Sequence, residues 1–147
     1  MSQTDYLAFV KKTNIERLIS HLNGIGASIV QSYPMAEVQS WTIQREEANT
    51  VIAAGASATL AMAPFLVLVC EAHHGSSTGA ARLAQVKAKA AEVKANADLW
   101  AALSAYVNGL RARTQDVIEA AETENAAHAA LHAAFAELET WRTSVGI

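Results

Sequence analysis

The amino-acid sequence predicts an all-α protein, an elongated helical bundle with a long coiled-coil-like C-terminal helix or helical hairpin. Three observations support this fold class. Apolar residues recur three and four positions apart along nearly the whole chain, which is the period of a helix rather than of a strand. The 147 residues include 32 alanines, and alanine has the highest intrinsic helix propensity. The chain contains only two prolines and seven glycines, the residues that most often interrupt a helix.

Length, charge and cysteine content narrow the function classes. We expect a single helical domain over residues 1–147, with shorter helices in 1–75 and a long helical segment in 76–147, because this is the length of one domain. The net charge of -3 argues against a nucleic-acid partner, since phosphate binding needs concentrated Lys and Arg. The lone cysteine, Cys70, leaves no intrachain disulfide and no cysteine zinc cluster.

The first predicted helix covers residues 4–22. Thr4 or Asp5 is its expected N-cap, because both side chains accept hydrogen bonds from backbone N–H groups of a first helical turn. Apolar spacing continues beyond Gly24 and Gly26, which favours a helix that runs on through the two glycines.

Two more helices are predicted before residue 75. One runs from about residue 34 to 53 and begins at Pro34, because proline suits the first helical turn. The other covers residues 63–74. Its segment 65–69 is rich in β-branched and aromatic residues, so a strand stays an alternative there.

Residues 48–70 carry no charged side chain and are long enough to cross a bilayer. Polar residues and Pro64 lie inside this stretch, and no basic cluster flanks it to set a topology. We therefore expect buried helix and no membrane partner. A membrane-spanning helix is the alternative.

A seam of apolar positions is predicted for residues 80–121, a length of roughly 60 Å as one helix. The spacing is that of a coiled coil, which needs a facing helix, so we expect self-association or docking along it. After a polar interruption at 122–125 the apolar face resumes, and one very long helix or a hairpin both fit. The seam positions are Leu83, Val86, Ala90, Val93, Ala97, Trp100, Leu103, Val107, Leu110, Thr114, Val117 and Ala121.

No constellation in the sequence predicts catalysis, cofactor binding or a metal site. His128 and His132 are four residues apart on one helix face, but no third ligand accompanies them. Cys70 and His74 have the same spacing and are expected to be a buried thiol and a polar helix end. The loop at 75–79 lacks the Gly-Lys-Ser/Thr end of a phosphate-binding loop. We therefore expect a protein that is not an enzyme.

Large aromatic and aliphatic side chains are the better functional candidates. The three tryptophans are spread one per long segment, and residues of this type dominate cores and interfaces. These side chains are expected either to pack within the protein or to contact a partner protein, and the sequence leaves both roles open. The candidates are Tyr33, Trp41, Trp100, Leu103, Val107, Leu110 and Trp141.

One block of residues carries a family resemblance. Residues 32–48 contain the pattern S-Y-P-x-A-E-x-x-S-W-x-x-Q-x-x-E-A. It resembles small helical tail or tail-fibre-associated proteins of tailed bacteriophages. Two further blocks follow in the family's order, from Pro64 to Gly75 and from Ala95 to Asp116, with Val67, Asn96 and Thr114 as departures from its pattern.

The resemblance implies a non-enzymatic protein of the virion tail that passes through the host cytoplasm during assembly. Its implied partners are other tail or tail-fibre proteins. Copies of itself are expected as well, with a trimer favoured because fibres are commonly trimeric. Virion component and assembly chaperone are both compatible with it, and a holin-like membrane protein using residues 48–70 is a further alternative.

Overall fold

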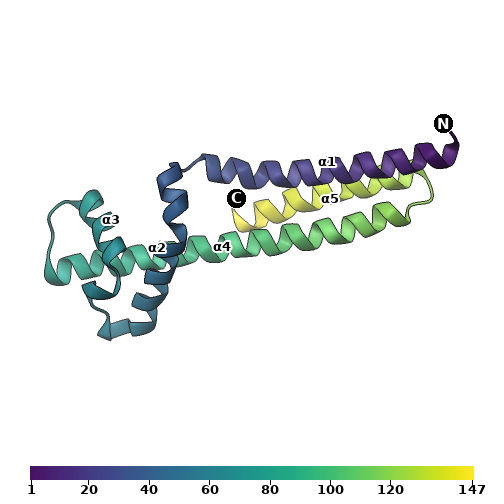
Figure 1. Ribbon diagram of the computed structural model, residues 1–147. Coiled ribbons are helices and arrows are strands. Elements are labelled where there is room, and N and C mark those ends of the chain that lie inside the picture. The colour runs from purple at the N-terminus through teal and green to yellow at the C-terminus, as the bar shows by residue number, and fades with distance from the viewer. The chain divides into compact units, whose positions relative to one another are not determined.

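The computed structural model describes residues 1–147 (Figure 1). Helices contain 88% of the residues and no strand is present, which confirms the all-α prediction. The strand alternative at 65–69 is wrong, because these residues lie in a helix. The elements are α1 (Gln3–Gln31), α2 (Met35–Ala54), the 3₁₀ turns η1 (Gly55–Ser57) and η2 (Leu60–Met62), α3 (Pro64–His74), α4 (Gly79–Ala120) and α5 (Glu124–Val145).

The chain divides into two compact units. The terminal unit consists of residues 1–29 and 104–147, and the central unit consists of residues 30–103. Helix α4 contributes its first part to the central unit and its last part to the terminal unit. The single domain expected from the chain length stays a prediction.

Three helical segments lie side by side in the terminal unit: α1, α5 and the last part of α4, which runs antiparallel to the other two (Figure 1). Val10 of α1, Ile118 of α4 and Ala127 of α5 are buried together in one hydrophobic cluster. The Lys11 ammonium also donates a hydrogen bond to the main-chain oxygen of Glu119 at 2.7 Å. Each helix of this unit therefore buries one face against the other two.

Two helices, rather than one, form the C-terminal half of the chain. Helix α4 ends at Ala120 and α5 begins at Glu124. Thr123 caps α5, because its hydroxyl accepts a hydrogen bond from the backbone N–H of Ala126 at 3.2 Å. The first part of the polar interruption is thus a turn that ends at the N-cap Thr123, and its last two residues already belong to α5.

Helix α1 begins earlier than predicted and runs through both of its glycines. The Ser2 hydroxyl accepts a hydrogen bond from the Asp5 N–H at 3.1 Å, and the Asp5 carboxylate accepts one from the Ser2 N–H at 3.1 Å. This reciprocal pair is a capping box. The expected N-cap at Thr4 or Asp5 is therefore wrong, because Ser2 holds that position with Asp5 as its partner three residues on.

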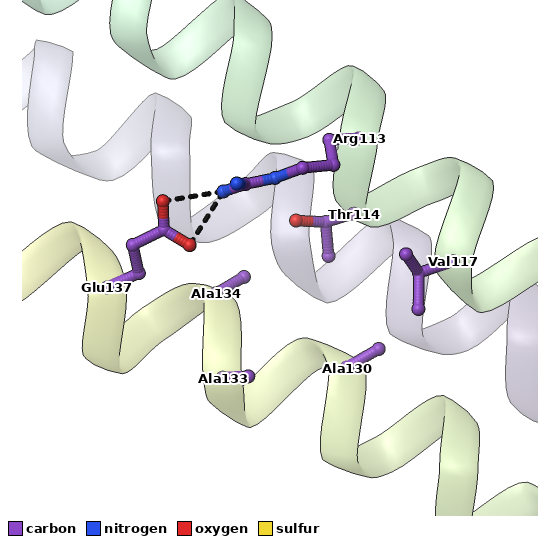
Figure 2. A pocket seen from close by; sticks show the side chains of 7 residues that line it. All are labelled: Arg113, Thr114, Val117, Ala130, Ala133, Ala134 and Glu137. Atoms are coloured by element: carbon purple, nitrogen blue, oxygen red, sulfur yellow. Dashed lines mark hydrogen bonds and ion pairs between the residues drawn. The ribbon is translucent and has the colours of Figure 1, made fainter.

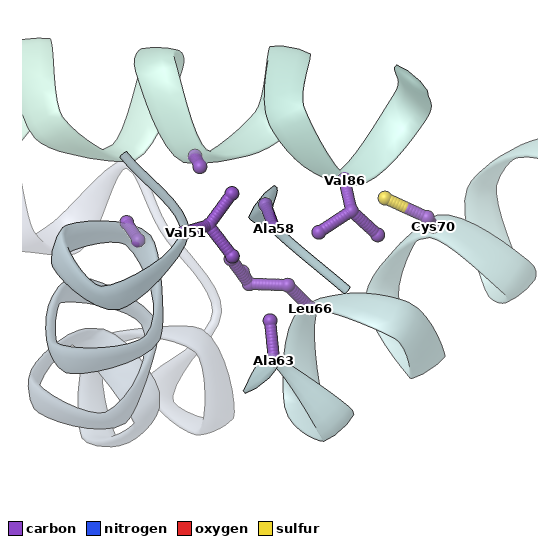
Figure 3. Close-up of a cluster of buried hydrophobic side chains, with 8 residues drawn as sticks. Val51, Ala58, Ala63, Leu66, Cys70 and Val86 are labelled. Carbon is purple, nitrogen blue, oxygen red and sulfur yellow. The ribbon is translucent and has the colours of Figure 1, made fainter. Parts of the chain in front are cut away.

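Small side chains dominate the core of the central unit. Figure 3 shows the cluster, in which Val51 of α2, Leu66 of α3 and Val86 of α4 meet. Short side chains let the backbones approach closely while the interior stays densely packed. The other fully buried members are Ala48, Ala58, Ala63, Cys70 and Ala90.

The uncharged stretch 48–70 is not one continuous helix. It is divided among the end of α2, the turns η1 and η2, and most of α3. Gly55 has a φ of 55°, which ends α2 in a conformation that glycine adopts most easily. No helix in the structure is both long enough and apolar enough to span a bilayer.

The buried face of α4 follows the predicted seam only in part. Val86, Leu110 and Thr114 are buried as expected, but Val117 is 51% exposed and the adjacent Ile118 is fully buried. A straight helix has 3.6 residues per turn and drifts by about 20° per heptad away from a 3.5-residue repeat. Over several heptads this drift moves the buried face by one residue, which explains the exchange of Val117 for Ile118.

Candidate functional site

An aromatic cluster in the central unit brings together three of the predicted residues. The ring of Tyr33, just before α2, meets the ring of Trp41 edge to face, with centroids 5.4 Å apart and planes at 82°. Trp41 in turn lies 6.2 Å from Trp100 of α4. Edge-to-face and offset arrangements are the favourable ones for aromatic pairs. We call these three residues the aromatic cluster.

The aromatic cluster is partly open to solvent. Tyr33 is 41% exposed and Trp100 is 37% exposed, while Trp41 is half-buried between them. Rings of this size supply much of the contact energy in protein interfaces. The cluster is thus neither a closed core nor a set of isolated surface residues, and it presents two large rings at the surface.

The remaining predicted candidates have different environments. Leu103 and Leu110 are buried at 4% and 3% exposure, so they are packing residues within the structure. Val107 is half-buried. Trp141 of α5 is also half-buried and stacks on Tyr106 of α4, with centroids 4.3 Å apart and planes at 4°.

Several residues of the 32–48 block have clear packing or hydrogen-bonding roles. Glu47 accepts hydrogen bonds from the backbone N–H groups of Phe65 at 3.0 Å and Leu66 at 2.8 Å. These are free N–H groups of the first turn of α3, which has no side-chain cap of its own. The Gln44 amide donates to the Ser40 hydroxyl at 2.7 Å. Tyr33 and Trp41 are the two aromatic residues of this block, and both are left partly accessible.

A buried arginine holds the loop between α3 and α4. The Arg82 side chain is 3% exposed and donates to the main-chain oxygens of Gly75 and Ser77 and to the Gln85 amide oxygen. The Gly75 oxygen lies at the C-terminal end of α3, where the helix dipole favours a cation. Loop 75–79 is therefore an interhelical connection held by Arg82. The sequence did not predict this role, because nothing in it distinguishes Arg82 from the exposed basic residues of the same helix.

A small groove lies between α4 and α5 in the terminal unit (Figure 2). Its volume is about 140 Å³. Arg113 and Glu137 face one another across it, and one guanidinium nitrogen donates to both carboxylate oxygens at 2.6 Å. The floor and walls are small or apolar and consist of Thr114, Val117, Ala130, Ala133 and Ala134.

Three polar side chains beside the groove, Tyr106, Glu137 and Arg113, are linked by hydrogen bonds. The Tyr106 hydroxyl donates to Glu137 at 3.1 Å. The hydrogen bond from Arg113 lowers the pKa of Glu137, and burial followed by the hydrogen bond to Glu137 raises the pKa of Tyr106. The sequence did not predict this network, because its members are 24 and 31 residues apart and only the turn at 121–123 brings them together.

The histidine and cysteine candidates do not assemble into a metal site. No group of three or more His, Cys, Asp or Glu side chains is placed to hold a metal ion. His73 and His74 stack on each other at the end of α3, with centroids 4.1 Å apart. Cys70 is buried at 2% exposure, and burial raises the pKa of its thiol.

Comparison of the chain with protein families, curated proteins and solved structures found no match.

Proposed function

We propose that this chain is a non-enzymatic bacteriophage tail protein, a structural or assembly component associated with the tail or the tail fibres. It acts in the virion tail and is present in the host cytoplasm during assembly. The support comes from the 32–48 block, whose pattern resembles that of tail-associated proteins.

The aromatic cluster is the observation that carries this proposal. Glu47, Gln44 and Ser40 of the block have partners inside the central unit. Tyr33 and Trp41, with Trp100, retain accessible ring surface. We assign this surface to contact with another tail or tail-fibre protein.

The finer architecture is part of the same proposal. The chain is an elongated helical bundle whose residues 76–147 associate in a coiled-coil-like manner with further helices. A homo-oligomer follows from this, and a trimer matches the symmetry of a fibre. Light scattering at micromolar concentration measures the stoichiometry, and a compact monomer would contradict this part.

Two alternatives share some of the support. A tail-fibre assembly chaperone would use the same aromatic cluster and leave the finished particle. A holin-like membrane protein would use residues 48–70, which are divided among α2, two 3₁₀ turns and α3. We favour the tail protein over the holin because of this division.

Deletion of the gene from the phage that encodes the chain tests the proposal. We expect particles with missing or defective tails in electron micrographs, and restoration by the gene supplied in trans. Mass spectrometry of purified virions then separates the two assembly roles, because a stoichiometric peptide signal indicates a component and its absence a chaperone. Normal tails combined with failure of host lysis would overturn the proposal in favour of the holin.

A further inference from the structure

The groove between α4 and α5 leaves apolar surface uncovered. Val117 of α4 is 51% exposed, and Ala133 of α5 is exposed as well. Both side chains line the groove (Figure 2). A coiled-coil seam needs a facing helix, and Val117 is a position of the predicted seam that the terminal unit leaves half exposed.

Arg113 and Glu137 are the two charged residues that line this groove. A single guanidinium nitrogen, Nη2, donates to both carboxylate oxygens, and the other two nitrogens have no acceptor in the chain. A guanidinium carries five N–H donors, so Arg113 retains donors for a second carboxylate. The Arg113 side chain is 60% exposed and that of Glu137 is 45% exposed. Both charges are therefore within reach of a second molecule.

The two charges make the groove complementary to itself in one orientation. Helices α4 and α5 are antiparallel (Figure 1), and Arg113 and Glu137 lie at one level because they are hydrogen-bonded. If two copies meet through the groove about a two-fold axis parallel to the helices, α4 of each copy lies over α5 of the other. Arg113 of each copy then faces Glu137 of the other, and the four charges alternate in sign. A two-fold axis across the helices at this level would instead bring two Arg113 side chains together.

We propose that copies of this chain associate through the groove between α4 and α5, with Arg113 of one copy bonded to Glu137 of the next. Val117 and Ala133 become buried at the contact, and the short side chain of Ala133 lets a helix of the next copy come close. A three-fold axis parallel to the helices gives six alternating charges in the same way, so this interface also fits a trimer. The inference rests on the homo-oligomer of the proposed function and names the surface that forms it.

Charge reversal in single copies, followed by mixing, tests this interface. Arg113→Glu makes both groove charges negative, and Glu137→Arg makes both positive. Each variant alone is expected to associate at least about tenfold more weakly than the parent, because like charges then face each other across the contact. In an equimolar mixture the negative groove of one variant faces the positive groove of the other, so association should return. Light scattering measures the assembly, and native mass spectrometry identifies the variants that it contains.

Mixing separates a contact between copies from a contact within one copy. An ion pair that acts only inside the chain is not restored by mixing, so a mixture that associates as weakly as the single variants would overturn the proposal. Single variants that associate as strongly as the parent would overturn it too, and would assign the homo-oligomer to another surface. A parent that stays monomeric would overturn both the interface and the homo-oligomer, while the gene deletion would still decide the tail role.

A steric variant decides the question even if a charge variant does not fold. Ala133→Arg keeps both groove charges and places a long side chain at an exposed position of the groove. It should fold and associate at least about tenfold more weakly than the parent, because the new side chain clashes with the next copy. The matched control is His132→Arg, at an exposed position of α5 that does not line the groove, and it should associate like the parent. Equal association of these two variants would overturn the proposal.

Discussion

One carboxylate oxygen of Glu47 accepts a hydrogen bond from the backbone N–H of Leu66 at 2.8 Å, and this ties α2 to the first turn of α3. The other oxygen accepts from the N–H of Phe65. Ala63, at the N-cap position of α3, has no side chain to do this. An acid at a helix N-terminus also interacts favourably with the helix dipole. A residue 19 positions away in the sequence thus supplies the missing cap.

Glu47→Ala should destabilise the protein by about 1–2 kcal/mol, the range for loss of a helix cap with charge-assisted hydrogen bonds. Glu47→Gln should cost less, because its amide oxygen can replace one acceptor. Urea unfolding monitored by circular dichroism measures both. Glu46→Ala is the matched control, since Glu46 is an exposed neighbour on the same helix. Equal losses at the two positions would contradict the capping role.

Arg82→Leu should cost about 2–3 kcal/mol, because it leaves main-chain oxygens at the end of α3 and in the loop without donors. Arg82→Lys should recover little of this loss, since a lysine has a single donor centre and cannot reach Gly75, Ser77 and Gln85 together. Thermal melting compares these variants with Lys87→Met on the exposed face of α4. Full stability of Arg82→Lys would show that charge alone, without the fork of donors, holds the loop.

The pair between Arg113 and Glu137 predicts a pH dependence of stability. The pKa of Glu137 is lowered in the folded protein, chiefly by the hydrogen bond from Arg113. A carboxyl whose folded pKa lies below its unfolded value stabilises the fold above the unfolded pKa, and this contribution disappears as the pH falls through the folded pKa. Glu137→Gln should therefore be less stable than the parent at pH 7, and the difference should shrink once the pH falls below the unfolded pKa of about 4.3 and vanish below the lowered folded pKa. A difference between the two proteins that stays constant from pH 7 down to acid unfolding would contradict this assignment.

Cys70 should be unreactive in the folded protein. It is 2% exposed, and burial raises its pKa, so little thiolate is present and the sulfur is covered. We expect iodoacetamide to label it at least about a thousandfold more slowly than in urea, because labelling requires an opening that costs several kcal/mol. Labelling at the rate of the unfolded chain would show that the core of the central unit is open.

The helices could be predicted from the sequence because each carries local signals. Pro64 and Gly75 mark the start and end of α3, and Pro34 marks the start of α2, within one residue of the observed boundaries. Apolar periodicity also predicted that α1 continues through Gly24 and Gly26. These features depend on residues that are only a few positions apart, so they can be recognised in a single sequence.

The interactions between helices could not be predicted in the same way. Glu47 and Leu66, or Arg113 and Glu137, meet only after the turns between their helices are set. The burial of Asn14 in α1 was also missed, because a lone asparagine in a long helix does not show which face it occupies. Trp41, Tyr33 and Trp100 were selected by residue type and by their positions in the 32–48 block and on the predicted seam. Their arrangement as one partly exposed cluster required the structure.

Trp41→Ala tests the central claim most directly, that the aromatic cluster contacts a tail partner. Trp41 is half-buried, so its loss should cost about 1–2 kcal/mol and lower the melting temperature by about 3–8 °C, leaving the protein folded at growth temperature. Ile43→Ala, at an exposed position of the same helix, is the matched control. A double change of His128 and His132 to glutamine should have little effect on either stability or assembly.

The decisive measurement is the yield of tailed infectious particles when each variant is supplied to a phage that lacks the gene. The account predicts that Trp41→Ala is folded but fails to restore tails, whereas Ile43→Ala and the double histidine variant restore them. Restoration of tails by Trp41→Ala together with failure of the double histidine variant would contradict it, because the function would then lie at the histidines of α5.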